Sequence, residues 1–171
     1  MIRPARESDL PRIAEIHAEA WHYAYSNILS SRVLATITPE ARLPVWKEWF
    51  AEDSYDISVY LDQNKPMGFI LICPAREVAT PPPNYAELSH LYIDPKHIGH
   101  GVGHLLFQEA VSQIQSKGYE GMLLWTLEHN TVAREFYESH NMEHDGTRQD
   151  EPEWLGPGIY EVRYLLKFSA N

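Results

Sequence analysis

Residues 92–106 read Tyr92-Ile93-Asp94-Pro95-Lys96-His97-Ile98-Gly99-His100-Gly101-Val102-Gly103-His104-Leu105-Leu106. This order predicts the end of a strand, a tight turn and the start of a helix. Glycines at the alternate positions 99, 101 and 103 let the backbone approach a ligand closely and turn several N–H groups into one space. A helix N-terminus adds unpaired N–H donors and the positive end of the helix dipole. The segment therefore predicts a pyrophosphate cradle that does not depend on lysine.

Other glycine-rich motifs fit this segment less well. A dinucleotide-binding fingerprint has the spacing G-x-G-x-x-G, whereas this loop has G-x-G-x-G. A P-loop would end in Gly-Lys-Ser/Thr, which the segment lacks. A glycine-rich turn without a ligand stays open as an alternative on the loop alone, so the decision rests on its neighbours.

The length and charge of the chain limit its class. The 171 residues fit a single domain over residues 1–171. The net charge is 14 − 24 = −10 with histidines neutral. Nucleic acid is therefore not an expected partner, because phosphate backbones need clustered Lys and Arg. The charge favours a cationic substrate, although it could equally serve only to keep the protein in solution.

The sequence also bears on the compartment. No apolar stretch approaches the roughly 20 residues that a membrane helix needs, and charged residues at positions 3, 6, 7 and 9 interrupt any signal peptide. The single cysteine, Cys73, cannot form an internal disulfide, which suits a reducing environment. We expect a cytoplasmic protein with no membrane partner.

Strand-like and helix-like segments alternate along the chain, which predicts an α/β or α+β layered domain. The predicted strands are 2–5, 56–61, 67–73, 85–93, 122–127 and 160–168, and the predicted helices are 10–24, 38–50, 101–117 and 131–140. The segment 74–84, with prolines at 81, 82 and 83, is expected to be irregular.

The residues around the glycine loop resemble the acetyl-CoA motif of the GNAT superfamily of N-acetyltransferases. The resemblance is carried by Glu87-Leu88-Ser89-His90-Leu91-Tyr92-Ile93-Asp94-Pro95 and by Gly99-His100-Gly101-Val102-Gly103. It implies a GNAT fold, with a mixed, mostly antiparallel sheet flanked by helices. It also implies that the backbone of Leu91, Tyr92 and Ile93 binds the pantetheine arm of acetyl-CoA. The pyrophosphate would lie on the amides of Ile98, Gly99, His100, Gly101, Val102 and Gly103.

One position departs from the family pattern. The loop usually begins with Arg or Gln, and this chain has Ile98 there. The change keeps the backbone amide but removes a side-chain contact, so it implies weaker CoA binding. His100 stands where Lys or Arg is frequent and would partly compensate.

A second segment, from Leu124 to Glu138, continues the resemblance: Leu-Trp-Thr-Leu-Glu-His-Asn-Thr-Val-Ala-Arg-Glu-Phe-Tyr-Glu. Asn130 is placed to cap a helix, and its amide can also bond to a ligand. Ala133 and Tyr137 fall on the same helical face. The small side chain of Ala133 leaves space for the CoA arm, and Tyr137 would direct its hydroxyl toward the sulfur.

Direct acetyl transfer explains a tyrosine at this place. An amine attacks the thioester carbonyl, and CoA leaves as a thiolate. A tyrosine hydroxyl, with an ordinary pKa of about 10, can donate to a thiolate whose parent thiol has a pKa of about 8.5. Tyr137 is thus the predicted general acid, although a tyrosine alone is more often a core aromatic. Direct transfer needs no nucleophilic residue, so Cys73 is interpreted as a buried strand residue.

The amine must lose a proton before it attacks. Glu87 is the first candidate for the general base, directly or through water, and it resembles an acidic residue that many family members carry there. A solvated carboxylate is the alternative. His90 is the second candidate for the base, because an imidazole titrates near pH 6.5. Strand alternation predicts that Glu87 and His90 lie on opposite faces, so that only one of them faces the site.

Two other groups of side chains leave alternatives open. His97, His100 and His104 straddle a turn without a Cys or carboxylate to complete a zinc set, so no metal is expected. The aromatic and histidine side chains of the first two helices could line an amine pocket or belong to the core; they are Trp21, His22, Tyr23, Tyr25, Trp46 and Trp49.

Together these patterns predict an acetyl-CoA-dependent N-acetyltransferase that acts on a primary amine of a small molecule or a peptide. The alternative is a non-catalytic module of the same fold that binds or senses acyl-CoA. The resemblance leaves a homodimer open and does not name the amine.

Overall fold

The computed structural model describes residues 1–150 and 152–169. Within these residues, seven strands form one sheet in the order β1-β2-β3-β4-β5-β7-β6. Neighbouring strands are antiparallel except β4 and β5, which run parallel. The strands are β1 Ile2–Pro4, β2 Asp56–Asp62, β3 Lys65–Pro74, β4 Tyr85–Ile93, β5 Gly121–Leu127, β6 Glu143–Asp150 and β7 Tyr160–Lys167. The predicted mixed, mostly antiparallel sheet is confirmed.

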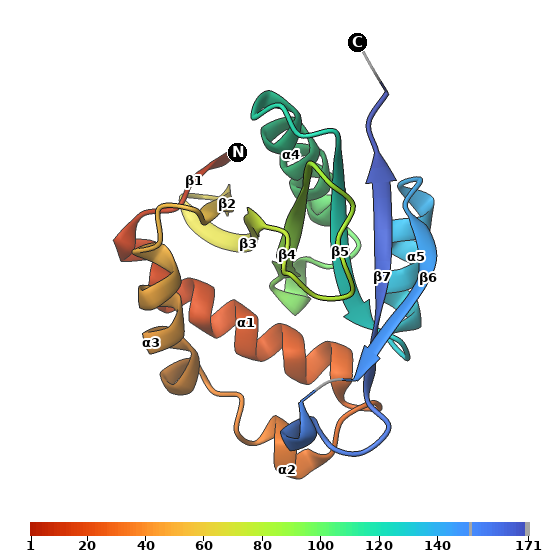
Figure 1. Cartoon of the computed structure of the whole chain (residues 1–171). Coiled ribbons are helices and arrows are strands. Elements are labelled where there is room, and N and C mark those ends of the chain that lie inside the picture. The colour runs from red at the N-terminus through yellow and green to blue at the C-terminus, as the bar shows by residue number, and fades with distance from the viewer. Residues whose placement is uncertain (151, 170–171) are drawn as a thin grey trace.

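Helices cover both faces of this sheet (Figure 1). On one face α1 contacts β3 and β4, and α3 packs against α1. On the other face α4 contacts β3, β4 and β5, and α5 lies on the same side. The helices are α1 Leu10–Tyr25, α2 Ser31–Leu34, α3 Pro39–Phe50, α4 Val102–Ser116 and α5 Thr131–Ser139, with short 3-10 turns at Glu7–Asp9, Pro95–His97 and Glu153–Leu155.

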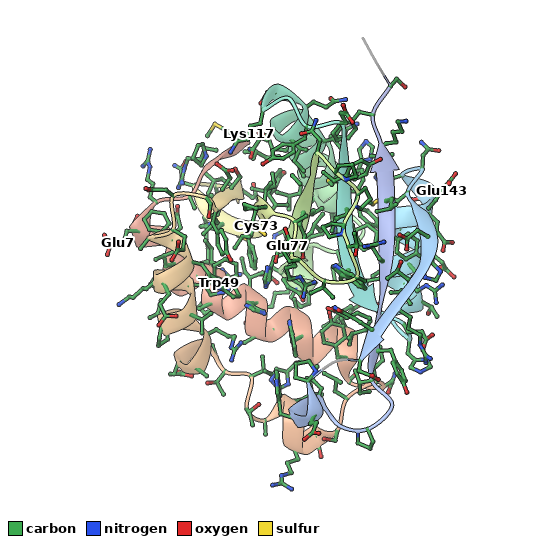
Figure 2. All side chains as sticks on the ribbon, viewed as in Figure 1. Glu7, Trp49, Cys73, Glu77, Lys117 and Glu143 are labelled. Atoms are coloured by element: carbon green, nitrogen blue, oxygen red, sulfur yellow. The ribbon has the colours of Figure 1, made fainter. Side chains whose placement is uncertain are left out.

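Each face of the sheet has its own apolar core. Alternate residues of β3 serve the two cores, because successive side chains of a strand point to opposite faces. Ile70 and Ile72 pack with buried residues of α4, whereas Phe69 and Leu71 pack with α1 and with Trp46 of α3. Figure 2 shows side chains filling the space on both sides of the sheet. The two cores fix β4 between α1 and α4.

Local signals explain several boundaries. The Thr38 hydroxyl accepts a hydrogen bond from the Ala41 amide at 3.2 Å, so α3 begins at Pro39 as predicted. The Asn130 side chain accepts from the Ala133 amide at 3.3 Å and caps α5, again as predicted. Gly118, at φ +83°, follows the last turn of α4 in the left-handed conformation that glycine tolerates.

Two elements escaped the sequence analysis. The edge strand β6 reads Glu-His-Asp-Gly-Thr-Arg-Gln-Asp and offers no apolar alternation to detect. Its side chains are mostly exposed, because it pairs only with β7 at the rim of the sheet. The single turn α2 is capped by Ser30, whose hydroxyl accepts from the Val33 amide at 3.2 Å.

A bulge in β4 overturns the prediction for Glu87 and His90. Glu87 pairs with Cys73 and His90 with Leu71, while Ser89 has no partner residue on β3. The extra residue shifts the alternation by one, so Glu87 and His90 lie on the same face of the sheet. This is the face that α1 and α3 cover. The prediction that they point to opposite faces was wrong, because nothing in the sequence marks a bulge.

Candidate active site

A cavity of about 790 Å³ lies where β4 and β5 diverge. The two strands pair only along Tyr85–Glu87 and Gly121–Leu123. Beyond these pairs, residues 88–93 of β4 and 125–127 of β5 line the cavity. Along this stretch β4 stays paired with β3 on one side, but its strand pairing with β5 on the other side has ended. An extended ligand arm could take the place of the missing strand.

The loop before α4 forms one end of the cavity. Ile98 and Gly103 line it, together with Asn130, Ala133 and Tyr137 from the start and first turns of α5. Among the described residues, none accepts a hydrogen bond from the backbone amides of residues 99–104. These unpaired N–H groups at a helix N-terminus fit the pyrophosphate of CoA.

Glycine is required at this loop for two different reasons. Gly99 and Gly101 have φ values of +82° and +79°, which side-chain-bearing residues adopt only with strain. Gly103 has an ordinary backbone, but a Cβ there would lie 3.0 Å from Ile93 Cδ1 and 3.4 Å from the Phe136 ring. The first two glycines shape the turn, and the third lets α4 pack closely against β4 and α5.

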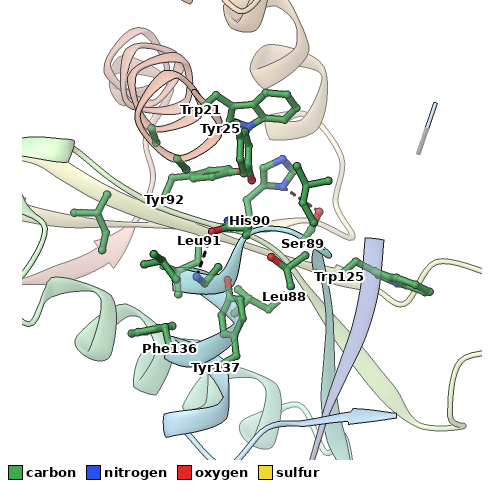
Figure 3. Close-up of a pocket in the computed structure, with 18 of the residues that line it drawn as sticks. Trp21, Tyr25, Leu88, Ser89, His90, Leu91, Tyr92, Trp125, Phe136 and Tyr137 are labelled. Carbon is green, nitrogen blue, oxygen red and sulfur yellow. Dashed lines mark hydrogen bonds between the residues drawn. The ribbon is translucent and has the colours of Figure 1, made fainter. Parts of the chain in front are cut away.

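Tyr137 reaches from α5 toward the strand that carries Leu91 (Figure 3). Burial, and then the proximity of Tyr92, raises the pKa of Tyr137 above its ordinary value. The phenol therefore keeps its proton near neutral pH. Its hydroxyl donates to no acceptor among the described residues, so it is available to a group in the cavity.

On the α1 side of the sheet, aromatic side chains surround the Tyr92 hydroxyl. It accepts a hydrogen bond from Trp21 Nε1 at 2.9 Å and lies 3.3 Å from the Tyr25 hydroxyl. All three side chains line the cavity. Burial, and then the proximity of Tyr92, raises the pKa of Tyr25 well above its ordinary value. The cavity thus connects the α5 side of the sheet, with Tyr137, to the α1 side.

His90 lines the same cavity, among rings from α1 and α3. Burial, with Arg76 and Arg42 adding to it, lowers the pKa of His90 to about 3. His90 is therefore neutral at physiological pH and a weak base. Beside it, His17 stacks on Tyr92 with ring centroids 5.2 Å apart, and its Nδ1 accepts a hydrogen bond from Trp46 Nε1 at 3.0 Å.

The far end of the cavity carries charge. Glu87 is 1% exposed and accepts two hydrogen bonds from Arg76, one from the backbone amide at 3.0 Å and one from Nε at 2.9 Å. Arg76 Nη2 lies 3.6 Å from Glu161, and the guanidinium lies 5.8 Å from the centre of the Trp125 ring. Burial raises the pKa of Glu87, although Arg76 opposes the shift. Arg76 and Glu161 line the cavity, and Glu87 lies directly behind Arg76.

The structure brings most of the expected residues together. Those that line the cavity are Leu91, Tyr92, Ile93, Ile98, Gly103, Asn130, Ala133 and Tyr137. Gly99, His100, Gly101 and Val102 lie in the adjoining loop and helix start, and the Val102 side chain is in the core. Of the aromatic side chains left open, Trp21, Tyr23, Tyr25 and Trp49 line the cavity, whereas Trp46 is fully buried in the core.

Three residues of the site were not predicted from the sequence: Arg76, Glu161 and Trp125. Arg76 follows β3 at the start of the proline-rich segment, where no periodicity indicates the direction of a side chain. In the β5–β7 register Trp125 pairs with Arg163 and Glu161 pairs with Leu127, which puts Trp125 and Glu161 near each other on the same face of the sheet. Detecting them would have required the topology.

Neither a cluster of metal ligands nor a membrane-spanning helix is found among the described residues. No group of three or more His, Cys, Asp or Glu side chains is arranged to hold a metal ion. None of the helices found in residues 1–150 and 152–169 combines the length and the apolar character needed to cross a membrane.

Comparison with known proteins agrees with this geometry. Residues 11–142 match the model of the acetyltransferase (GNAT) family. A protein of Mycobacterium tuberculosis provisionally named an N-acetyltransferase is 28% identical over 180 residues, covering 99% of this chain and 94% of that protein. A Bacillus subtilis protein provisionally named phosphinothricin acetyltransferase is 28% identical over 177 residues, covering 97% and 94%.

Solved structures share the fold. PaiA N-acetyltransferase from Thermoplasma acidophilum, in complex with coenzyme A, has a TM-score of 0.76 and 21% identity, with 98% of each chain covered. Ribosomal-protein-alanine N-acetyltransferase from Brucella melitensis has a TM-score of 0.77 and 20% identity, with 98% and 99% covered. With the family match over most of its length, the chain belongs to the GNAT family of acetyltransferases and is an N-acetyltransferase.

Proposed function

We propose that this enzyme transfers an acetyl group from acetyl-CoA directly to the primary amine of a small molecule that also carries an anionic group. The observation that carries the proposal is the single cavity between β4 and β5. It runs from the loop before α4, at Ile98 and Gly103, past Tyr137 to the Arg76 guanidinium. Acetyl-CoA, when bound, supplies the thioester.

Different parts of the cavity would bind CoA and donate the proton. The amides of residues 98–103 would hold the pyrophosphate, and the part of β4 beyond its pairs with β5, at Leu91, Tyr92 and Ile93, would hold the pantetheine arm. Asn130 and Ala133 line the same path. Tyr137, protonated near neutral pH because burial raises its pKa, would donate its proton to the departing sulfur.

Glu87 stays our candidate for the base that accepts the proton of the amine through water. Burial raises the pKa of its carboxyl, which makes it a stronger base than an exposed carboxylate. Its carboxylate also holds Arg76 on the cavity wall. His90 is the weaker candidate, because burial lowers its pKa to about 3.

The acceptor is expected to carry an anionic group because Arg76 faces the cavity with its Nε already bound to Glu87. Nη2 lies 3.6 Å from Glu161, so Nη1 is the terminal nitrogen left to donate to a carboxylate or a related acid. The name of the Bacillus subtilis relative gives phosphinothricin, a small acidic amino acid, as its acceptor. The Brucella melitensis neighbour, by contrast, is named for a ribosomal protein, so peptides belong in the test.

The test is the release of free thiol from acetyl-CoA with acidic amino acids, polyamines, aminoglycosides and short peptides as acceptors. Release with acidic amino acids alone supports the proposal. Release with peptides or polyamines alone overturns the anionic acceptor and keeps the enzyme. No release in a sample that binds CoA favours the non-catalytic alternative. The cytoplasmic location, the single domain over 1–171 and a homodimer stay predictions.

A further inference from the structure

Histidines take the place of fixed cations beside the pyrophosphate loop. Between Asp94 and His104 the sequence has one lysine, Lys96, and no arginine, but it has three histidines. CoA brings a pyrophosphate and a 3′-phosphate to this region, and anions of this kind are commonly met by Lys or Arg. The question is whether these imidazoles can supply the same charge.

His100 is oriented so that it can take up a proton. Its Nδ1 lies 3.1 Å from the carbonyl oxygen of Ile98. A carbonyl oxygen only accepts, so Nδ1 carries the hydrogen and the lone pair is on Nε2. No described residue bonds to Nε2, and the side chain is exposed. Protonation at Nε2 therefore breaks no hydrogen bond and strengthens the one to Ile98.

His104, in the first turn of α4, is fixed in the same tautomer by His140. The Nδ1 of His140 lies 2.7 Å from the carbonyl oxygen of Phe136, so it donates there and its Nε2 can only accept. His104 Nδ1 lies 2.8 Å from that Nε2 and must therefore donate. The atom of His104 that is left to take up a proton is again Nε2, and this imidazole is also exposed.

The charges around the two imidazoles are few. His100 has His97 as its ring neighbour, with centroids 6.5 Å apart, and Lys96 lies on the same turn. Asp94 lies 3.8 Å from His97 and is paired with Arg12. Among the described residues, no carboxylate pairs with His100 or His104. A bound phosphate would therefore meet either imidazole without displacing an ion pair.

We propose that His100 and His104 bind the phosphates of CoA as imidazolium ions, so that CoA binding is coupled to the uptake of protons from solvent. The proposal goes beyond the transfer reaction and rests only on CoA binding in this loop. Thermodynamic linkage gives the direction in which CoA affinity changes with pH, because a phosphate raises the pKa of an imidazole that it contacts. Affinity is then full on the acid side of the imidazole range and falls as the pH rises through it.

The test is isothermal titration of CoA into the enzyme from about pH 6 to 8, near the ordinary imidazole pKa of about 6.5, in buffers of different ionisation enthalpy. The buffer dependence of the heat gives the number of protons taken up. A pKa rise of about one unit at one imidazole corresponds to at most a tenfold change in affinity over this range. The phosphate monoester of CoA also titrates near pH 6. The proton uptake of the wild type is therefore compared with that of the His100→Gln/His104→Gln double variant, because the contribution of the ligand cancels in the difference.

Two single variants separate charge from packing. At pH 6 His100→Gln should bind CoA more weakly than the wild type, but more tightly than the wild type does at pH 8, because His104 keeps its charge. His100→Arg should lose less affinity than the wild type between pH 6 and pH 8, because the charge at position 100 is then permanent. His144→Gln, on the edge strand β6, is the control and should keep the wild-type pH dependence. Proton uptake that is absent from the wild type, or that is undiminished in the double variant, overturns the proposal while leaving CoA binding and acetyl transfer intact.

Discussion

The Glu87 carboxylate receives hydrogen bonds from both the backbone amide and the Nε of Arg76, at 3.0 and 2.9 Å. Oε1 thus binds the guanidinium and Oε2 binds the backbone of the same residue, so the carboxylate fixes Arg76 at the wall of the cavity. The arrangement gives Glu87 a positioning role that is compatible with its role as a base.

Glu87→Gln separates these two roles. If the carboxylate mainly holds Arg76, the KM for an anionic acceptor should rise about 10- to 100-fold, since hydrogen bonds to charged groups contribute about 1.5–3 kcal/mol. A neutral amine acceptor should then be unaffected, and kcat should change little. Loss of kcat with both acceptors, together with loss of the acid limb of the pH–rate profile, would instead identify Glu87 as the base.

Tyr137→Phe should lower turnover about 10- to 1000-fold, the range for losing one general acid. The ring keeps its packing against the α4 side of the sheet, so CoA should still bind with nearly the wild-type dissociation constant. Steady-state rates and CoA titration of the same preparation check both statements. Unchanged turnover would remove Tyr137 from the mechanism.

Gly101→Ala and Gly118→Ala form a matched pair at the two ends of α4. Both glycines are left-handed, at φ +79° and +83°, and a Cβ at either meets nothing within 4 Å. Each substitution should cost about 1–2 kcal/mol of folding free energy by the same backbone strain. Only Gly101→Ala should also weaken CoA binding, because only Gly101 shapes the cradle. Denaturant unfolding and CoA titration measure the two effects.

Asp94 should stabilise the loop in a pH-dependent way. Burial opposes its ionisation, but the Lys96 amide and the Arg12 guanidinium outweigh burial and lower the pKa of Asp94. Its contribution to stability is then complete above the ordinary carboxyl pKa of about 3.9 and is lost as the pH falls through the lower folded-state value. The stability gap between wild type and Asp94→Asn should be constant near neutral pH and shrink in acid. Unfolding curves at pH 7 and in the acid range test it; a gap that widens in acid would contradict the assignment.

Cys73 should take no part in the chemistry although it lines the cavity. Burial raises the pKa of its thiol to about 12, so almost no thiolate is present at neutral pH. Cys73→Ser should keep kcat within about threefold, and iodoacetamide should label the folded enzyme slowly at pH 8. Mass spectrometry should find no acetylated Cys73 during turnover. A trapped thioester would overturn direct transfer.

The parts of the site that the sequence predicts are those encoded locally. The glycine loop, the Asn130 cap and the helical spacing of Ala133 and Tyr137 each depend on residues a few positions apart. Glu87 was recognised by resemblance, but its contact with Arg76 spans eleven positions across a proline-rich turn. The bulge at Ser89, which puts His90 on the same face as Glu87, has no local signature. Pairings set by strand register could not be predicted before the topology was known.

The fold itself was predicted where apolar periodicity was strong. Ile70 and Ile72 alternate with Phe69 and Leu71, and both sets are buried, as expected for a central strand covered on two faces. The edge strand β6 has almost no buried side chain, so it is held by backbone pairing with β7 rather than by an apolar pattern. Edge strands of this kind are hard to detect from sequence for that reason.

Three register pairs, Tyr85 with Gly121, Ala86 with Met122 and Glu87 with Leu123, join β4 to β5 in the described part of the sheet. The sheet therefore consists of two halves, β1–β4 and β5–β7–β6, which this short parallel pairing joins (Figure 1). A cosubstrate lying along β4 beyond these pairs would bridge the two halves of the sheet where their strand pairing ends. Binding of acetyl-CoA would then add contacts between the halves and align the reacting groups in one step.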